Sequence, residues 1–340
     1  MKKLFSVLLV ALLVAGLMTS ALAGSADGKK IALVGKSAGN AFFEVAADGF
    51  VKAAEGEGAT VEIVYPEDAT ADKQITVLDS LISQQPDAIC ISANDFNALQ
   101  AKLEEAMEAG IKVSAFDSAP NPASRQVFVN QVTNDAVAEG LLEAVYDIAG
   151  GEGQWAILSA TSQATNQNAW IDAMKALMAA DEKYAKLELV EVAYGDDEPQ
   201  KSTDQTQALL DNYPDLKVIC APTTVGVMAA AKLLQDTEGC NVKITGLGMP
   251  SEMKEYVGND DAHSCPYFYL WVQPNLGALS AYTTIALING DITGAEGETF
   301  TAGELGEFTI TAADDGGTQV VLGPLFQFNP DNIEEYAAIF

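Results

Sequence analysis

The stretch KIALVGKSAGNAFFEVAADGFVKAAEGE, residues 30–57, carries the pattern from which the fold is predicted. Its first part, 30–35, is a short, almost wholly apolar run, which is typical of a buried strand. A helix is predicted over 40–57, where apolar residues recur at helical spacing: Phe43, Ala47, Phe50 and Ala54. The stretch therefore predicts one strand followed by one amphipathic helix.

The same unit repeats along the first half of the chain. Further strands are predicted at 61–65, 88–92 and 113–116, and further helices at 73–84 and 98–109. Nearly continuous apolar strands that alternate with helices are typical of a parallel sheet covered on both faces.

The pattern restarts in the second half. Strands are predicted at 155–159, 187–194, 218–221, 242–246 and 266–271, helices at 168–180, 201–212, 226–236 and 276–289, and β-like runs at 307–311 and 320–322. Two consecutive halves of this kind predict an α/β fold with two Rossmann-like lobes. Since no linker rich in Pro, Gly or Ser divides them, the hinge is expected to consist of several short crossings.

The N-terminal segment, residues 1–23, has the features of a secretory signal peptide. Lys2 and Lys3 precede an apolar run, and Ala21-Leu22-Ala23 forms an A-x-A cleavage site. The apolar run is shorter than the about 20 residues that a membrane span needs. We expect cleavage after Ala23 and a soluble exported protein.

Composition narrows the classes of partner. The chain is 49% hydrophobic and 19% charged, as expected for a globular protein, with a formal net charge of −30. Such a negative surface repels nucleic acid and anionic lipid, so neither is expected as a partner.

The chain offers little for metal or thiol chemistry. It has one histidine, His263, in a polar turn, and no C-x-x-C motif, so neither a zinc site nor a Cys/His catalytic pair is expected. Cys90 and Cys220 lie in apolar runs and are expected to be buried thiols. Cys240 and Cys265 each precede such a run and form the candidate disulfide. No metal and no cofactor are expected.

Polar and aromatic side chains collect in the loops that follow the predicted strands. In open α/β sheets, ligands bind beyond the carboxyl ends of the strands. Carboxylates and amides hydrogen-bond sugar hydroxyls, and aromatic faces cover the apolar C–H patches of a sugar ring. The loops thus predict a site for a neutral polyol, and its candidate ligand-binding residues are Lys36, Asn40, Phe42, Phe43, Asn94, Asp95, Asp117, Ser118, Asn166, Gln167, Asn168, Pro222, Thr223, Thr224, Gly248 and Trp271.

Structural alternatives exist for several of these residues. Loop Asn and Asp residues are commonly helix caps or turn formers, which applies to Asn166. Phe43 could equally be a core residue, and a core position is the structural alternative for Trp271. A carbohydrate-active enzyme using Asp95 and Asp117 as paired carboxylates is the catalytic alternative. No nucleophile elbow or phosphate-binding loop is present in the sequence, so binding is favoured over catalysis.

The motifs resemble a known family. Lys36-Ser-x-Gly-Asn-x-Phe-Phe, Ser92-Ala-Asn-Asp, Thr165-Asn-Gln-Asn-x-Trp-Ile-Asp, Ala221-Pro-Thr-Thr and Gly246-Leu-Gly-x-Pro-Ser-Glu-Met are similar to periplasmic sugar-binding proteins of ABC importers, the ribose-binding type. Within that family the chain most resembles L-rhamnose-binding proteins. Autoinducer-2 receptors share Lys36, Asp117 and Gln167 but typically carry Asp at the position of Asn166.

The resemblance implies three crossings between two discontinuous lobes: 29–131 plus 272–308, and 132–271 plus 309–340. It implies that Lys36 donates to the ligand, that Asp117 accepts from two hydroxyl groups and that Trp271 covers an apolar sugar face. It also implies hinge closure around L-rhamnose or a close deoxy sugar and docking of a monomer on a membrane permease. The autoinducer-2 receptor and a chemoreceptor ligand relay remain alternatives.

Overall fold

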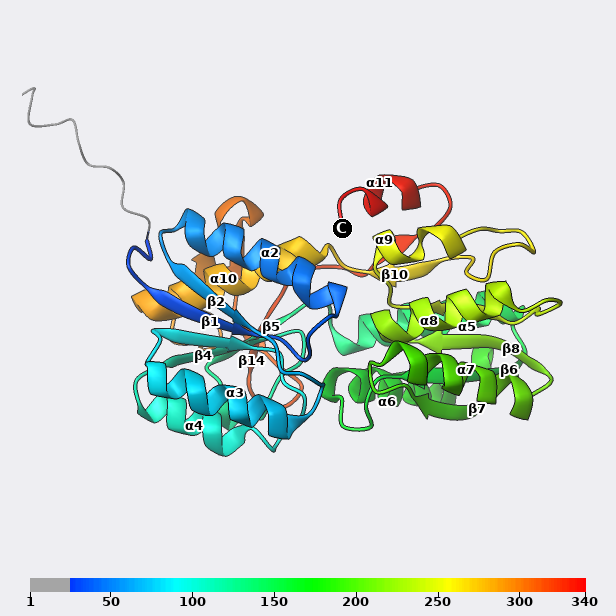
Figure 1. The fold of residues 1–340 in the computed structure, drawn as a ribbon, viewed down its shortest axis with the longest axis horizontal. Coiled ribbons are helices and arrows are strands. Elements are labelled where there is room, and N and C mark those ends of the chain that lie inside the picture. The colour runs from blue at the N-terminus through cyan, green and yellow to red at the C-terminus, as the bar shows by residue number, and fades with distance from the viewer. Residues whose placement is uncertain (1–24) are drawn as a thin grey trace, which may run out of the picture.

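The structure is a computed structural model that describes residues 25–340. The predicted signal peptide, residues 1–23, lies outside the described residues. Figure 1 shows two α/β lobes side by side, with the first in blue, cyan and orange and the second in green and yellow.

The first lobe is built on a seven-stranded sheet in the order β13-β14-β5-β4-β3-β1-β2. Its strands are β1 (Lys30–Val34), β2 (Thr60–Val64), β3 (Ala88–Ile91), β4 (Lys112–Phe116), β5 (Val127–Asn130), β13 (Thr311–Ala312) and β14 (Thr318–Val321). Strands β1 to β5 are parallel, β14 joins β5 in parallel, and β13 adds an antiparallel edge. The helices of this lobe are α2 (Ala41–Gly56), α3 (Ala71–Gln84), α4 (Gln100–Glu108) and α10 (Gln273–Asn289), and a hairpin joins β11 (Thr299–Thr301) to β12 (Glu307–Thr309).

Alternate residues of β1 lie on opposite faces of this sheet. Ile31 and Leu33 belong to the large core that contains the apolar face of α2. Ala32 and Val34 belong to a separate cluster with Leu78 of α3. A strand covered on both faces is apolar throughout, which explains why its sequence shows no alternation.

Helices α2 and α10 pack closely against one face of the sheet (Figure 1). A side chain at Gly277 would collide with the carbonyl oxygen of Ala46, and one at Gly49 would collide with that of Pro274. These two glycines therefore permit the close approach of the helix backbones.

The second lobe contains a parallel four-stranded sheet in the order β7-β6-β8-β9. Its strands are β6 (Gly153–Ser159), β7 (Leu187–Tyr194), β8 (Leu216–Ala221) and β9 (Lys243–Gly246), and its helices are α5 (Asn134–Ala149), α6 (Thr165–Ala180), α7 (Pro199–Asn212), α8 (Thr224–Asp236), α9 (Pro250–Met253) and α11 (Ile333–Ala337). Strand β10 (Phe268–Leu270) pairs with β15 (Phe326–Phe328) and bridges to residue Leu247 after β9.

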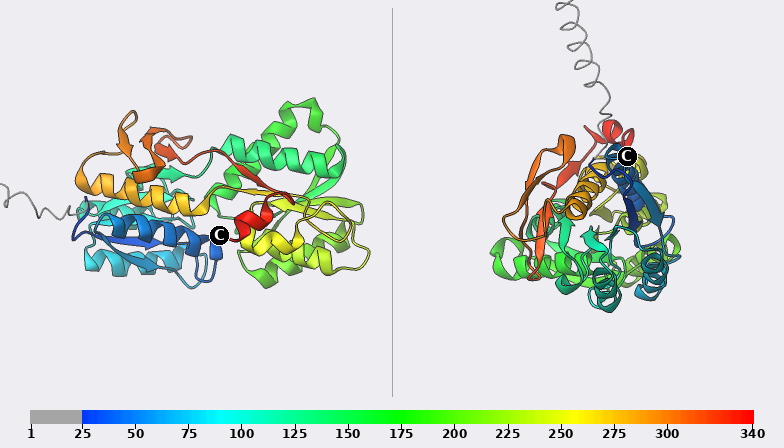
Figure 2. Two further views of the ribbon diagram at one scale, coloured as in Figure 1. Left: turned by 90° about the horizontal axis from the view of Figure 1, so that it is seen from above. Right: turned by 90° about the vertical axis from the view of Figure 1, so that its left-hand side faces the viewer.

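The chain crosses between the lobes three times: from β5 to α5, from β10 to α10 and from β14 to β15. Figure 2 shows these crossings gathered between the two bodies. The expected assignment of 309–340 to the second lobe is wrong for β13 and β14, because β14 pairs with β5 in the first sheet. The return to the second lobe falls after Val321.

The predicted fold class, two lobes with parallel sheets, is confirmed. The prediction contains no element between 117 and 154, where the structure has β5 and the long helix α5. Within residues 25–340, no helix has both the length and the apolar character that a membrane crossing requires.

Candidate functional site

A cavity of about 40 Å³ lies between the lobes, at the carboxyl ends of β1 and β4; we call it the central cavity. Its lining residues come from both lobes: Lys36, Asn40, Phe42, Phe43, Asp117, Asn166, Gln167, Trp170, Asp197, Pro222, Thr223, Thr224, Leu247, Leu270 and Trp271. Eleven of the sixteen predicted ligand-binding residues line it. The rule that ligands bind beyond the carboxyl ends of the strands therefore predicted the position of this cavity.

Lys36 and Asp117 form the charged pair of this cavity. Lys36 follows β1 and Asp117 follows β4, and because these strands are parallel their carboxyl ends lie at one edge of the sheet. Lys36 Nζ lies 3.7 Å from Asp117 Oδ2, which also accepts a 2.7 Å hydrogen bond from Ser92 Oγ. Burial raises the pKa of the Asp117 carboxyl, and the Lys36 ammonium partly opposes that rise. The pair thus places a buried donor beside a buried acceptor.

Asn166, in the first turn of α6, reaches this pair from the second lobe. Its Oδ1 accepts from Lys36 Nζ at 3.2 Å, and its Nδ2 donates to Asp117 Oδ1 at 3.2 Å. One amide side chain therefore links both charged groups across the cleft. The neighbouring Gln167 accepts from Ser159 Oγ and from the Ala160 amide, which holds the β6–α6 loop in place.

Asp197 is a cavity residue that the prediction omits. It follows β7 in a left-handed backbone conformation, with φ 55°, and its Oδ1 accepts from Thr223 Oγ1 at 2.6 Å. Burial raises the pKa of this carboxyl as well. The signal was available, since Asp196-Asp197 follows a strand like the other site loops. The cavity consequently holds two carboxylates and one ammonium.

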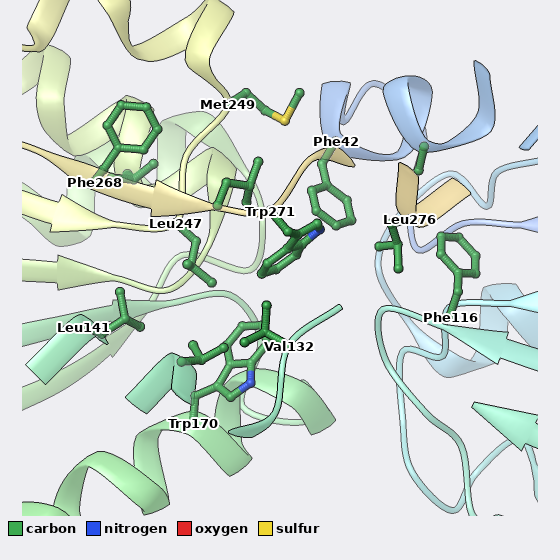
Figure 3. Close-up of a cluster of buried hydrophobic side chains, with 14 of the residues drawn as sticks. Phe42, Phe116, Val132, Leu141, Trp170, Leu247, Met249, Phe268, Trp271 and Leu276 are labelled. Atoms are coloured by element: carbon green, nitrogen blue, oxygen red, sulfur yellow. The ribbon is translucent and has the colours of Figure 1, made fainter. Parts of the chain in front are cut away.

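Aromatic rings form the apolar wall. Trp271 lies between Phe42 of the first lobe and Trp170 of the second, with ring centroids 5.9 Å and 6.4 Å away (Figure 3). Its Nε1 donates to Gln273 Oε1 at 2.5 Å, and Gln273 Nε2 donates to the Phe42 carbonyl at 3.0 Å. Trp271 is only 2% exposed, so it is both a cavity wall and a part of the core that joins the lobes.

Five predicted ligand-binding residues lie outside the central cavity: Asn94, Asp95, Ser118, Asn168 and Gly248. Asn94 Nδ2 donates to the Lys36 carbonyl at 2.9 Å and so supports the loop beside the cavity. Asn168 Nδ2 instead bonds the Ser162 carbonyl. Gly248 packs near Phe268 in the second lobe.

Asp95 and Ser118 do not line the central cavity. Asp95 Oδ1 accepts from the backbone amides of Asn97 and Ala98, as a turn-forming residue does. It lines a different cavity from Asp117, so the two carboxylates do not share one site as the catalytic alternative requires. Ser118 is fully buried, and its Oγ has no partner among the described residues.

The predicted disulfide is absent: all four cysteines of the described chain are free thiols. Cys265 is fixed by backbone bonds to Tyr256 and Gly258, whereas Cys240 ends a turn that begins at Thr237. Cys265 is buried and Cys240 is only partly buried, so the two side chains lie in different surroundings. In residues 25–340, no group of three or more His, Cys, Asp or Glu side chains is arranged to hold a metal ion.

Comparisons with known proteins agree on one family. The sequence model of a family described as "Periplasmic binding protein domain" matches residues 31–292. An ABC transporter solute binding protein from Clostridium phytofermentas, solved with bound L-rhamnose, is similar with a TM-score of 0.91 and 51% identity, covering 93% of this chain and all of that one.

Two further solved structures are similar. A sugar ABC transporter protein from Actinomyces odontolyticus has a TM-score of 0.72 and 39% identity, covering 92% of this chain and 99% of that one. LsrB from Clostridium saccharobutylicum, in complex with AI-2, has a TM-score of 0.83 and 23% identity, covering 90% and 99%. At that identity the last likeness concerns the fold alone.

Proposed function

The chain belongs to the periplasmic binding protein family, and on that premise we propose that it is the sugar-binding component of an ABC importer and binds L-rhamnose in the central cavity. The observation that carries the sugar assignment is the Lys36–Asp117 pair, buried between the lobes and bridged by Asn166. The choice of L-rhamnose is supported by the similarity to a solute binding protein that holds this sugar.

The lining suits a neutral deoxy sugar. Asp117 and Asp197 accept hydrogens from hydroxyl groups, while Lys36 donates to a ring or hydroxyl oxygen. Because the carboxylates outnumber the ammonium, sugar acids and sugar phosphates would be repelled. The methyl group of L-rhamnose would lie against the apolar part of the wall, where Leu247, Leu270 and Trp271 line the cavity.

Binding requires the lobes to separate. The central cavity, at about 40 Å³, is far smaller than the about 150 Å³ cavity that admits a benzene ring. A pyranose therefore enters an open form and is enclosed as the cleft closes around it, a hinge motion carried by the three crossings. We propose that each lobe moves as a unit. The first lobe consists of 29–131 and 272–308 together with β13 and β14, and the second consists of 132–271 and 322–340.

The family implies a periplasmic location, and we propose export by cleavage after Ala23. The closed, sugar-bound monomer would dock on the importer's permease, and a chemoreceptor is the alternative partner. We propose no chemical turnover: the bound sugar is released unchanged. An autoinducer-2 receptor is the alternative ligand assignment, and Asn166 disfavours it because those receptors typically carry Asp at this position.

The test is a thermal-shift screen of the purified protein with L-rhamnose, L-fucose, D-ribose, D-apiose and autoinducer-2. A ligand present at 100 times its dissociation constant stabilises the protein by about 2.7 kcal/mol. We expect the largest shift with L-rhamnose, and we expect chromatography to recover the sugar intact. A shift with autoinducer-2 alone would contradict the ligand assignment, and a recovered product other than L-rhamnose would contradict the absence of turnover.

A further inference from the structure

A second cavity lies between the lobes beside the central one; we call it the side cavity. It measures about 230 Å³, well above the about 150 Å³ that admits a benzene ring. It lies over the carboxyl ends of β4 and β5 and the turn between β13 and β14, and its other wall is the start of α5 and α6. Asp117, Asn166 and Trp170 line both cavities, so the two share one wall.

The side cavity has the lining of a carbohydrate site. Phe96, Phe128 and Trp170 supply aromatic surface, which suits the C–H face of a sugar ring. Amide side chains supply donors and acceptors for hydroxyl groups. The amides in question are Asn130, Gln131, Asn134 and Gln319.

Gln131 has an unused acceptor at this place. The residue is 1% exposed, and its Nε2 donates to the Asp117 carbonyl at 3.2 Å. Its Oε1 has no hydrogen-bond partner in the part of the chain that the structure describes, and the same holds for the buried Oγ1 of Thr165, which also lines the cavity. Buried polar atoms in folded proteins are normally paired, so the Gln131 oxygen is available to accept from a hydroxyl group of an occupant, and the Thr165 hydroxyl to donate or accept.

The ionisable side chains that line the side cavity are all carboxylates, and Asp315 is paired with Arg125. Asp315 Oδ1 and Oδ2 accept from Arg125 at 3.0 and 2.7 Å, and Asp314 Oδ2 accepts from Asn134 Nδ2 at 3.1 Å. Asn134 is neutral, so its hydrogen bond leaves the charge of Asp314 in place, and among the described residues the lining contains no Lys or Arg that could pair with an anion. We therefore expect an occupant without negative charge, a condition that a neutral glycoside meets.

We propose that the side cavity is a second subsite, which holds the second ring of a neutral glycoside whose first ring occupies the central cavity. The proposal rests on the proposed function, because it extends the same sugar site from a monosaccharide to a rhamnose-containing disaccharide. The connection runs past Asn166, which lines both cavities.

A third cavity between the lobes is the competing location for the second sugar ring. It lies toward the β2 and β3 side of the sheet, measures about 340 Å³ and is lined by Asp68, Asp95, Asp196 and Glu198. Ala69 lines this acidic cavity and Ala169 lines the side cavity, and neither lines the central one. Replacing each by Phe fills one cavity at a time. Ala176 is exposed on the same helix as Ala169 and serves as a matched control.

The experiment is calorimetric titration of the full chain and the variants Ala169→Phe, Ala69→Phe and Ala176→Phe. The probes are L-rhamnose and the α-(1→2)-, α-(1→3)- and α-(1→4)-linked rhamnosyl-L-rhamnose disaccharides. We expect the unmodified protein to bind at least one disaccharide, and Ala169→Phe to weaken that binding by about tenfold or more, which corresponds to about 1.4 kcal/mol. Ala69→Phe and Ala176→Phe should leave it within about twofold, and all variants should bind L-rhamnose within about twofold of the unmodified protein.

Three results would overturn the second subsite while leaving L-rhamnose binding intact: no disaccharide binds, Ala169→Phe has no effect, or Ala69→Phe alone weakens the disaccharide. Failure of the unmodified protein to bind L-rhamnose would instead overturn the proposed function, and the inference with it. If Ala169→Phe does not fold, Ala313→Phe fills the same cavity from the turn in the first lobe and is judged by the same criteria.

Discussion

Lys36 and Asn166 meet across the cleft: Lys36 Nζ donates a 3.2 Å hydrogen bond to Asn166 Oδ1, although 130 residues separate them in the chain. One belongs to the loop after β1 and the other to the first turn of α6. Because the bond joins the two lobes, it stabilises the closed arrangement directly.

Removing this link should weaken sugar binding. A hydrogen bond to a charged group contributes about 1.5–3 kcal/mol, so we expect Asn166→Ala to raise the dissociation constant for L-rhamnose about tenfold or more. Asn168→Ala is the matched control, since its side chain bonds Ser162 outside the cavity. Calorimetry measures both, and equal affinities for the two variants would contradict the role of Asn166.

Tryptophan fluorescence should report closure. Trp271 and Trp170 line the central cavity, whereas Trp155 is buried in β6 and does not. L-rhamnose should therefore change the emission of the unmodified protein and of Trp155→Phe. The change should be greatly reduced in Trp271→Phe. An undiminished change in Trp271→Phe would place the ligand away from this ring.

The buried Asp197 carboxyl should make stability depend on pH. Its pKa is raised in the folded state, so the unfolded state releases the proton first as pH rises. The carboxyl's contribution is fully present below its ordinary pKa of 3.8 and is lost as pH rises through the folded value. Lys36, Asp117 and Asp196 act on the same group.

Urea unfolding of the unliganded protein tests this sign. Asp197→Asn should become progressively more stable than the unmodified protein as pH rises above 3.8, because the amide has no proton to lose. The same variant should bind L-rhamnose more weakly, since it loses a charged acceptor. A stability difference that stays constant with pH would refute the burial of an ionised group at this position.

Thiol counting should find one reactive cysteine in the folded protein. Cys240 is partly exposed, whereas Cys90, Cys220 and Cys265 are buried. Burial raises the pKa of Cys90 and of Cys220 to about 12, which further suppresses their thiolate forms. A thiol reagent should titrate one group in the native protein, none in native Cys240→Ser, and four in the denatured protein. Two thiols after denaturation would instead indicate the Cys240–Cys265 bridge.

The parallel sheets were predictable because strands covered on both faces are unbroken apolar runs. The end of the first sheet was predictable only in part. The β-like run at 320–322 overlaps β14, but its lobe follows only from the pairing of β14 with β5, and the exposed β13 joins the sheet through β14. Helix α5 did carry a signal, since Val137, Leu141 and Val145 recur at helical spacing after the Thr133 cap.

The sequence predicted which loops form the candidate site, but not in every case which side chain of a loop lines it. Position after a parallel strand identified Lys36 and Asp117, since the topology brings those ends together. It did not separate Asp95, which bonds its own turn, from Asp197, which a left-handed backbone turns into the cavity. Which aspartate lines the cavity depends on local hydrogen bonds and backbone dihedral angles, and the position of a residue after a strand does not determine these.

The central claim is that Asp117 holds L-rhamnose between the lobes, and calorimetric titration of Asp117→Ala tests it most directly. Asp95→Ala is the matched control, because Asp95 lines another cavity, and a thermal transition in each variant verifies folding. Loss of two charge-assisted bonds, at about 1.5–3 kcal/mol each, should weaken binding about 100-fold or more in Asp117→Ala. Asp95→Ala should bind L-rhamnose as the unmodified protein does. If Asp117→Ala also binds with unchanged affinity, the sugar does not lie in the central cavity.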